Sequence, residues 1–217
     1  MLPIDVAGQR LVLLPEKAAF LPDHHTLLVA DAHVGKAVSF RRWGVPVPRG
    51  TTGETLDRLT RLIDAMAATR LVFLGDFLHS RRAHAPSTLG ALHRWRERHA
   101  DLEVVLVRGN HDDRAGDPPA TLGVRCADEP WPLGPLALCH HPRPVAGLYA
   151  LAGHLHPCIG LSGRARDRLR LPCFWFGRDV GVMPAFGSFT GMHPVPVAEG
   201  DRVYAVADAR VVAMPAA

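Results

Sequence analysis

The run Leu71-Val72-Phe73-Leu74-Gly75-Asp76 is the clearest indication of the fold, because it joins a short apolar segment to a glycine and a carboxylate. Four apolar residues closed by a turn signal are typical of a buried strand. Residues 27–30 and 104–107 have the same form, and polar residues follow each of them. The sequence therefore predicts three buried strands whose ends carry polar side chains.

Two amphipathic helices are predicted between these strands. Thr51 and Glu54 form a capping box, and apolar residues then recur at helical spacing to an end near Thr69. A second helix is expected over residues 87–99. Because strands and helices alternate, we expect a parallel sheet with right-handed crossovers.

After about Pro118, short apolar runs separated by Gly and Pro predict strands rather than helices. These strands should cover residues 136–139, 148–152, 169–176, 203–206 and 211–214, and another should cover residues 11–14. We therefore expect an α/β (α+β) fold in which two mixed β-sheets pack face to face and helices flank them. No repeat or linker divides residues 1–217, which favours a single domain.

The composition excludes several classes of protein. Of 217 residues, 47% are hydrophobic, which supplies a sizeable core and excludes a disordered chain. No apolar run is long enough to span a bilayer, and the N-terminus lacks the pattern of a signal peptide. The four cysteines form no CxxC pair, which favours free thiols in a cytoplasmic protein.

Charge and histidine content indicate what the chain binds. The net charge is +4, and only Lys17 and Lys36 among the 25 basic residues are lysines. Arginine binds phosphate with two nitrogens, but an Arg-rich proteome explains most of the arginines equally well. The 13 histidines favour a site for metal binding or proton transfer.

Five short motifs end the predicted strands: Asp31-Ala-His33, Gly75-Asp76, Gly109-Asn110-His111-Asp112, His140 and Gly153-His154-Leu155-His156. Side chains two residues apart at a strand end point the same way, which lets a carboxylate and an imidazole share one cation. The same spacing lets the last two histidines each reach a different metal, and the Gly-Asp carboxylate could bridge two. This mixed nitrogen and oxygen set suits Mn²⁺, Fe or Zn²⁺ better than Ca²⁺.

Each motif alone has an ordinary structural explanation, since Gly-Asp pairs occur in many turns and His140 beside His141 could be a core or surface pair. Their order, each after an apolar strand, resembles that of the calcineurin-like metallophosphoesterases over about residues 26–157. The resemblance implies two packed sheets and two metal ions, the first bound by Asp31, His33 and His156 and the second by Asn110, His140 and His154. Asp76 would bridge the ions. His111 would contact the phosphate and donate a proton to the leaving oxygen, with Asp112 orienting it.

A narrower resemblance rests on Leu21-Pro22-Asp23, residues 30–36, Pro46-Val47-Pro48-Arg49-Gly50, Pro172-Cys173-Phe174 and Pro184-Ala185-Phe186-Gly187. These look like a bacterial DNA-repair subgroup encoded beside a DNA ligase, a helicase and an exonuclease-like protein. The subgroup is similar to manganese-dependent DNA endonucleases. It implies two Mn²⁺ ions, a DNA substrate that is single-stranded or flapped, and a functional association with those three proteins.

The candidate substrate contacts are His79, Asn110, Lys36 and Arg170. Lys36 belongs to a basic cluster with Arg41, Arg42 and Arg49, and Arg170 ends an alternating series that begins at Arg164. If that series is a strand, its arginines share one face and could contact DNA phosphates, although a solvated hairpin tip fits equally well. Two other functions remain open: a phosphodiesterase for nucleotide-sized substrates, and a non-catalytic scaffold of the same fold.

Overall fold

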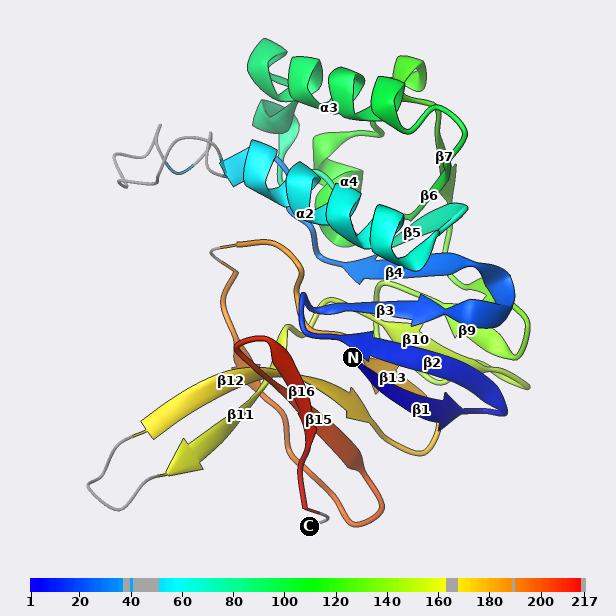
Figure 1. The fold of residues 1–217 in the computed structure, drawn as a ribbon, viewed down its shortest axis with the longest axis vertical. Helices are drawn as coiled ribbons and strands as arrows, with labels where there is room; N and C mark the ends of the chain where they lie inside the picture. The colour runs from blue at the N-terminus through cyan, green and yellow to red at the C-terminus, as the bar shows by residue number, and fades with distance from the viewer. Residues whose placement is uncertain (37–39, 41–50, 163–167, 189, 216–217) are drawn as a thin grey trace.

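Three parallel strands form the centre of the first sheet: β4 (Thr26–Ala30), β5 (Arg70–Leu74) and β6 (Glu103–Val107). The structure is a computed structural model that describes residues 1–36, 40, 51–162, 168–188 and 190–215. In that part of the chain the first sheet has the order β1-β2-β3-β4-β5-β6-β7 (Figure 1). Its outer strands are β1 (Leu2–Val6), β2 (Gln9–Leu14), β3 (Ala18–Leu21) and β7 (Val124–Ala127).

The central strands are buried on both faces, which explains why their sequences are continuous apolar runs. On β4, Leu27 and Val29 pack toward the helices, whereas Leu28 and Ala30 pack toward the second sheet. The helices α2 (Thr51–Met66) and α3 (Pro86–Arg98) cover the outer face of the first sheet (Figure 1). This arrangement confirms the parallel strands and flanking helices that the sequence predicts.

Helix α2, which the sequence predicts to end near Thr69, ends at Met66. Ala67 adopts a left-handed φ of 47°, and Ala68 N–H donates to Ile63 O at 3.1 Å. These features form a Schellman C-cap, which usually carries glycine at the left-handed position. Because alanine occupies that position here, the sequence offers no signal for this helix end.

The second sheet has the order β14-β11-β12-β13-β10-β9-β8 among the described residues, with β15 and β16 added beside β12. Its strands confirm the change of pattern after Pro118, although several of them are shorter than the sequence predicts or were not predicted. They are β8 (Trp131–Leu133), β9 (Leu136–Leu138), β10 (Tyr149–Ala152), β11 (Pro157–Ser162), β12 (Arg168–Phe176), β13 (Val180–Val182), β14 (His193–Pro194), β15 (Arg202–Ala207) and β16 (Arg210–Ala213).

The shorter helical elements lie in the loops between the strands, and three of them add one residue each to the core: Ala83, Ala115 and Leu122. One α-helix, α4 (Asn110–Ala115), is not anticipated by the sequence pattern and lies within the Gly109–Asp112 motif. The 3₁₀ helices are η1 (Pro22–His24), η2 (Arg81–His84) and η3 (Ala120–Leu122). No helix in the described part of the chain has the length and apolar character needed to cross a membrane.

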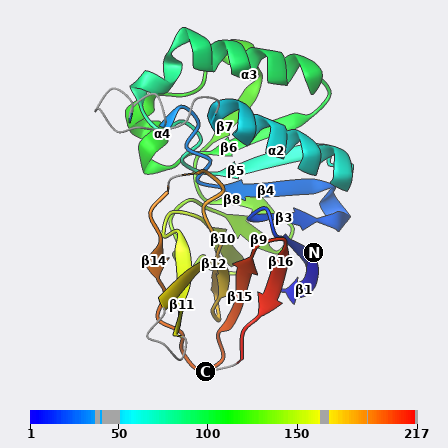
Figure 2. The ribbon, with the colours of Figure 1, turned by 60° about the vertical axis from the view of Figure 1, so that its left-hand side comes forward.

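The two sheets pack face to face, with the second sheet on the side opposite α2 and α3 (Figure 2). Their shared core joins Leu28, Val72 and Val105 of the first sheet to Leu138 and Phe174 of the second. Both of the expected basic clusters lie partly outside the described residues. The arginines that the structure does not describe are Arg41, Arg42, Arg49, Arg164 and Arg166.

Phe174→Ala is expected to lower the free energy of unfolding by about 3–5 kcal/mol, because the ring is fully buried between the sheets. Leu169→Ala, on the same strand with 55% of the residue exposed, is the matched control and should change it by less than about 0.5 kcal/mol. Urea unfolding monitored by circular dichroism measures both. Equal losses would contradict a core shared by the two sheets.

Candidate active site

Strands of both sheets bring the five motifs together. Asp31 and His33 follow β4, Asp76 follows β5, and the Gly109–Asp112 motif follows β6. The second sheet adds His140 after β9, and the motif containing His154 and His156 after β10, which runs parallel to β9. Loops at the carboxyl ends of parallel strands meet at one edge, which explains why motifs so distant in sequence converge.

The backbone that carries these side chains is not the extended strand end that the two-residue spacing suggests. Asp31, His33, Asp76, His154 and His156 have left-handed φ values of 52°, 46°, 50°, 71° and 50°. Non-glycine residues rarely adopt this conformation, which concentrates at functional sites. Sharp turns, rather than strand alternation, therefore aim the side chains of the Asp-x-His and His-x-His motifs.

Asp76 lies between two groups of histidines. Its Oδ2 is 3.8 Å from His33 Nε2, and its Oδ1 is 3.5 Å from His140 Nε2. Oδ1 also accepts a hydrogen bond from the His111 backbone N–H at 3.0 Å. The carboxylate is almost fully buried, so each oxygen has a fixed direction. This position lets one carboxylate face two neighbouring cations.

His140 presents a lone pair to the site. Its Nδ1 donates to Leu74 O at 3.2 Å, so the tautomer that can bind a metal ion carries its lone pair on Nε2. That Nε2 lies 3.0 Å from Asn110 Oδ1 and 3.0 Å from His154 Nδ1. A cation would reconcile the lone pairs that meet there, so this group fits a metal ion.

His140 also explains the glycine that precedes Asp76. A Cβ on Gly75 would lie 2.1 Å from His140 Nδ1, and Gly75 has a φ of +73°. No other residue type leaves room for the ring at this position. The Gly-Asp pair, an unspecific signal in the sequence, is therefore required by the approach of the second sheet.

Asp31, His33 and His156 form a second set of possible ligands. His156 Nδ1 donates to Gly191 O at 3.1 Å, which directs Nε2 to Asp31 Oδ1 at 3.5 Å. Asp31 Oδ1 and His33 Nδ1 are buried and have no hydrogen-bond partner among the described residues. Burial, followed by the charge of Lys36, lowers the pKa of His33 to about 2. The ring is therefore neutral, as a metal ligand must be.

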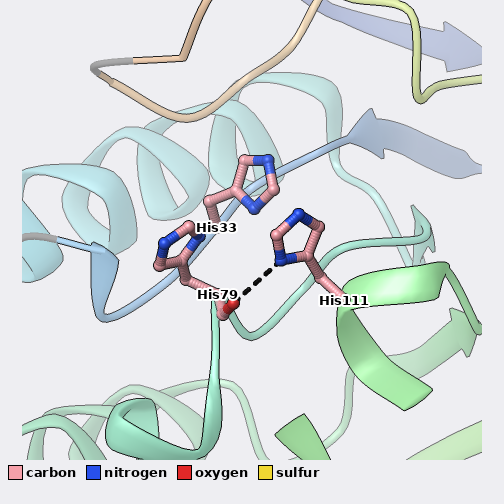
Figure 3. A group of neighbouring side chains, drawn as sticks. All are labelled: His33, His79 and His111. Carbon is pink, nitrogen blue, oxygen red and sulfur yellow. Dashed lines mark hydrogen bonds between the residues drawn. The ribbon is translucent and has the colours of Figure 1, made fainter. Parts of the chain in front are cut away.

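A third group joins His33 to His79 and His111 (Figure 3). His111 Nδ1 donates to the carbonyl oxygen of His79 at 3.0 Å, and the two rings stack with centroids 5.2 Å apart. This bond turns His111 Nε2 toward Asp76, whose Oδ2 is 3.9 Å away. Burial, then the charge of Lys36, lowers the pKa of His79 to about 4, so its ring is neutral.

Asp112 occupies a different place from the one the resemblance implies. Its Oδ1 accepts hydrogen bonds from Phe77 N–H and Leu78 N–H at 3.0 and 3.2 Å, and its Oδ2 accepts one from Gly109 N–H at 3.0 Å. No described contact joins the carboxylate to the His111 ring. The carbonyl of His79 orients that ring instead, and Asp112 ties together the loops that follow β5 and β6.

Glu129 and His141 belong to the site but were not anticipated. Glu129 Oε2 accepts hydrogen bonds from the backbone N–H groups of His140 and His141 at 2.7 and 2.9 Å. Its Oε1 lies 2.9 Å from His141 Nδ1, and His141 groups with His140 and His154 as a possible metal ligand. Nothing in the local sequence around Glu129 indicates this position.

Lys36 and Arg170, both expected to contact substrate, lie at different distances from the histidine groups. Lys36 lines a small cavity beside His33, and its Nζ lies 5.6 Å from the centre of the Phe40 ring. Burial lowers the pKa of Lys36, although Asp31 and Asp76 oppose the shift. Arg170 is exposed on β12 opposite Gly160, and no described contact connects it to the histidine groups.

The chain is similar in sequence to a known family and in fold to a solved structure. Residues 20–163 match the model of the calcineurin-like phosphoesterase family. The crystal structure of the nuclease MPE of Pseudomonas putida is 46% identical and superposes with a TM-score of 0.87 over 98% of this chain and 99% of that one. This match agrees with the narrower resemblance seen in the sequence.

A more distant structure, the phosphoesterase Yfce of E. coli, is 14% identical and has a TM-score of 0.43 over 88% of this chain and 98% of that one. No protein with a curated description matches the sequence. The family match covers more than half of the chain, and the matched segment contains all five motifs. The chain belongs to the calcineurin-like phosphoesterase family.

Proposed function

We propose that the chain is a DNA endonuclease that hydrolyses phosphodiester bonds with two divalent metal ions. The observation that carries this proposal is the position of Asp76, with one carboxylate oxygen facing each of two groups of possible ligands. The likeness to a nuclease over nearly the whole chain supports the choice of substrate. No described site residue lacks the side chain that the chemistry requires, which argues against a non-catalytic scaffold.

We assign the first ion to Asp31, His33 and His156, and the second to Asn110, His140 and His154, with Asp76 shared. Asp31 Oδ1, which has no hydrogen-bond partner among the described residues, supports the first set, and the lone pairs around His140 Nε2 support the second. When bound, two such ions stabilise negative charge on a phosphoryl group and favour ionisation of a water molecule. The mixed nitrogen and oxygen ligands favour Mn²⁺, with Fe or Zn²⁺ as alternatives.

His111 is the proposed general acid for the leaving oxygen. Its Nδ1–H bond to the His79 carbonyl holds the ring in place, and its Nε2 faces the site. We assign to the His79 ring a contact with the phosphate, because its buried Nδ1 has no hydrogen-bond partner in the described part of the chain and the neutral ring can donate. Asp112 is a positioning residue that holds the two loops in register.

The proposed substrate is single-stranded or flapped DNA in bacterial DNA repair, with a ligase, a helicase and an exonuclease-like protein as functional associates. Lys36 beside His33, with the more distant Arg170, supplies positive charge for the phosphate backbone. Contacts of this kind do not depend on base sequence. A cytoplasmic location, expected from the free cysteines, fits this substrate.

Removal of metal should abolish hydrolysis of a chromogenic diester, because the proposed mechanism activates water through the two bound ions. Mn²⁺ should restore the rate best, followed by Fe²⁺ or Zn²⁺. The measurement is a titration of each ion into stripped protein. Full activity in excess chelator, after the metal content has been checked, would contradict the metal mechanism.

Asp76→Ala and His111→Ala should fail for different reasons. Asp76→Ala removes the shared ligand, so both bound metal and activity should fall. His111→Ala should keep its metal but lose about 10²–10⁴-fold on diesters with poor leaving groups, and less on nitrophenyl esters.

Elemental analysis combined with kinetics on both kinds of ester separates these two outcomes. His25→Asn is the matched control, because His25 is exposed at the opposite end of β4 and asparagine tolerates its φ of 45°. Metal-free His111→Ala protein would overturn the roles assigned here.

Closed circular single-stranded DNA should be converted to linear and shorter products in the presence of Mn²⁺, since an endonuclease needs no free end. Gel electrophoresis of the circle beside a linear strand of equal length makes the test. If the circle survives while nucleotide-sized diesters are hydrolysed, the chain is a small-substrate phosphodiesterase instead.

A further inference from the structure

Both lysines of the chain lie beside the candidate active site, although arginines supply every other basic side chain. Lys17 lines a cavity of about 140 Å³ together with His156 and Ser188. Ser188 also lines a smaller cavity, of about 20 Å³, beside His33 and Lys36. The two lysines therefore flank the first set of possible metal ligands.

Lys17 reaches this place from the tight turn between β2 and β3. Its backbone N–H donates to Leu14 O at 3.1 Å, and its Nζ lies 3.5 Å from Gly187 O. Gly187 is fixed against the metal motif, because its N–H donates to Asp31 O at 3.0 Å. A Cβ there would lie 2.6 Å from Ala32 O. Gly187 thus links the side chain of Lys17, through its carbonyl, to the backbone of Asp31, through its N–H.

The ammonium group of Lys17 lacks a neutralising partner. No carboxylate lies within ion-pair distance of it in the described part of the chain, and Gly187 O is its one hydrogen-bond acceptor there. Burial, followed by the charge of Arg58, lowers the pKa of Lys17 to about 8. A half-buried cation without a carboxylate is unfavourable unless an anion completes its surroundings.

Arg58 adds a second positive charge beside Phe186, the residue that precedes Gly187. Its guanidinium stacks on the Phe186 ring with 3.7 Å between Cζ and the ring centre, and it donates to Phe186 O. Its Nε is buried, and no residue that the structure describes forms a hydrogen bond with it. Arg58 does not itself line the cavity, but its charge lies on the carbonyl next to the Gly187 carbonyl that Lys17 contacts and adds to the charge of the ammonium group.

We propose that this cavity binds the substrate phosphate adjacent to the one that is cleaved, with Lys17 as the binding residue and Arg58 as supporting charge. A lysine ammonium binds phosphate as a compact point charge, which suits a narrow cavity. The inference rests on the proposed function and deepens it, because a nucleotide-sized diester has no second phosphate to place there. It makes the site selective for a polynucleotide strand.

Two pairs of chromogenic diesters test the proposal, each pair differing by one phosphate. Thymidine 5′-(p-nitrophenyl phosphate) is compared with its 3′-phosphorylated form, and thymidine 3′-(p-nitrophenyl phosphate) with its 5′-phosphorylated form. With Mn²⁺ present, the added phosphate should raise kcat/KM about 10- to 100-fold in one pair, the range of a hydrogen bond to a charged group. The responding pair reveals on which side of the scissile bond the cavity lies.

Lys17→Met should remove this advantage, and Lys17→Arg should retain most of it. Arg10→Met, which removes an exposed cation from β2, should retain all of it. Circular dichroism and thermal unfolding check that each variant folds. A merely structural Lys17 would lower the melting temperature of the Met variant and leave the ratio within each pair unchanged, which would overturn the proposal.

A pH profile of the same ratio adds a readout specific to the ammonium group. Because kcat/KM reports the free enzyme, the advantage should decline as pH rises through about 8 in the wild type, and persist in Lys17→Arg. The charged groups around Lys17 are Arg58 on α2, Glu16 in the same turn and His156 in the cavity. His156 lines the same cavity, and Lys17→Arg leaves it unchanged. A decline that remains in Lys17→Arg would therefore not come from the Lys17 ammonium and would contradict its role.

Binding measurements keep this test separate from that of the proposed function. If no diester is hydrolysed, the proposed function fails, and calorimetry with Mn²⁺-loaded protein still compares thymidine 3′,5′-bisphosphate with both monophosphates. The bisphosphate should bind about tenfold more tightly than the better monophosphate, and Lys17→Met should equalise them. Equal binding in the wild type, or competition by inorganic phosphate with no advantage in either pair, overturns the proposal.

Discussion

The site depends on the hydrogen bond that the fully buried imidazole of His140 makes from the second sheet to the first. Its Nδ1 donates to the last carbonyl of β5 in the first sheet, while its backbone follows β9 in the second. The ring fills the space that a Cβ on Gly75 would need. The position of Nε2 is therefore fixed relative to Asp76 and Asn110 by the packing of the sheets themselves, and any shift between the sheets would separate the ligand groups.

The ligand loops store backbone strain that their neighbours hold in place. Left-handed φ values at non-glycine residues cost roughly 1–3 kcal/mol each in such settings, and Asp31, His33 and Asp76 all adopt them. His33 N–H donates to Asp76 O at 2.8 Å, and His154 N–H donates to Asp31 Oδ2 at 2.9 Å. Each strained loop is thus tied to another, and occupation of the site by cations would bind the same loops together from the inside.

The sequence predicts the central strands well and the site only in part. Apolar runs such as residues 71–74 are long enough to indicate burial on both faces, so the parallel strands were predictable. The end of α2 was not, because alanine takes the place of glycine in its C-cap. The motifs identify most of the side chains that meet at the site. The role of Asp112 and the contribution of Glu129, however, depend on backbone N–H groups that only folding brings close to them. Such contacts leave no local pattern in the sequence.

The charges around the site favour a strand of phosphates over a single one. Two buried carboxylates, Asp31 and Asp76, lie beside the neutral ring of His33, and two divalent ions would reverse the sign of that centre. Lys17 and Lys36 lie on its flanks without carboxylate partners at ion-pair distance among the described residues. Unpaired cations are a stability cost that folded chains retain where function requires it. A small diester would meet only the metal centre, whereas a polynucleotide carries the repeated negative charge that these flanking cations can bind.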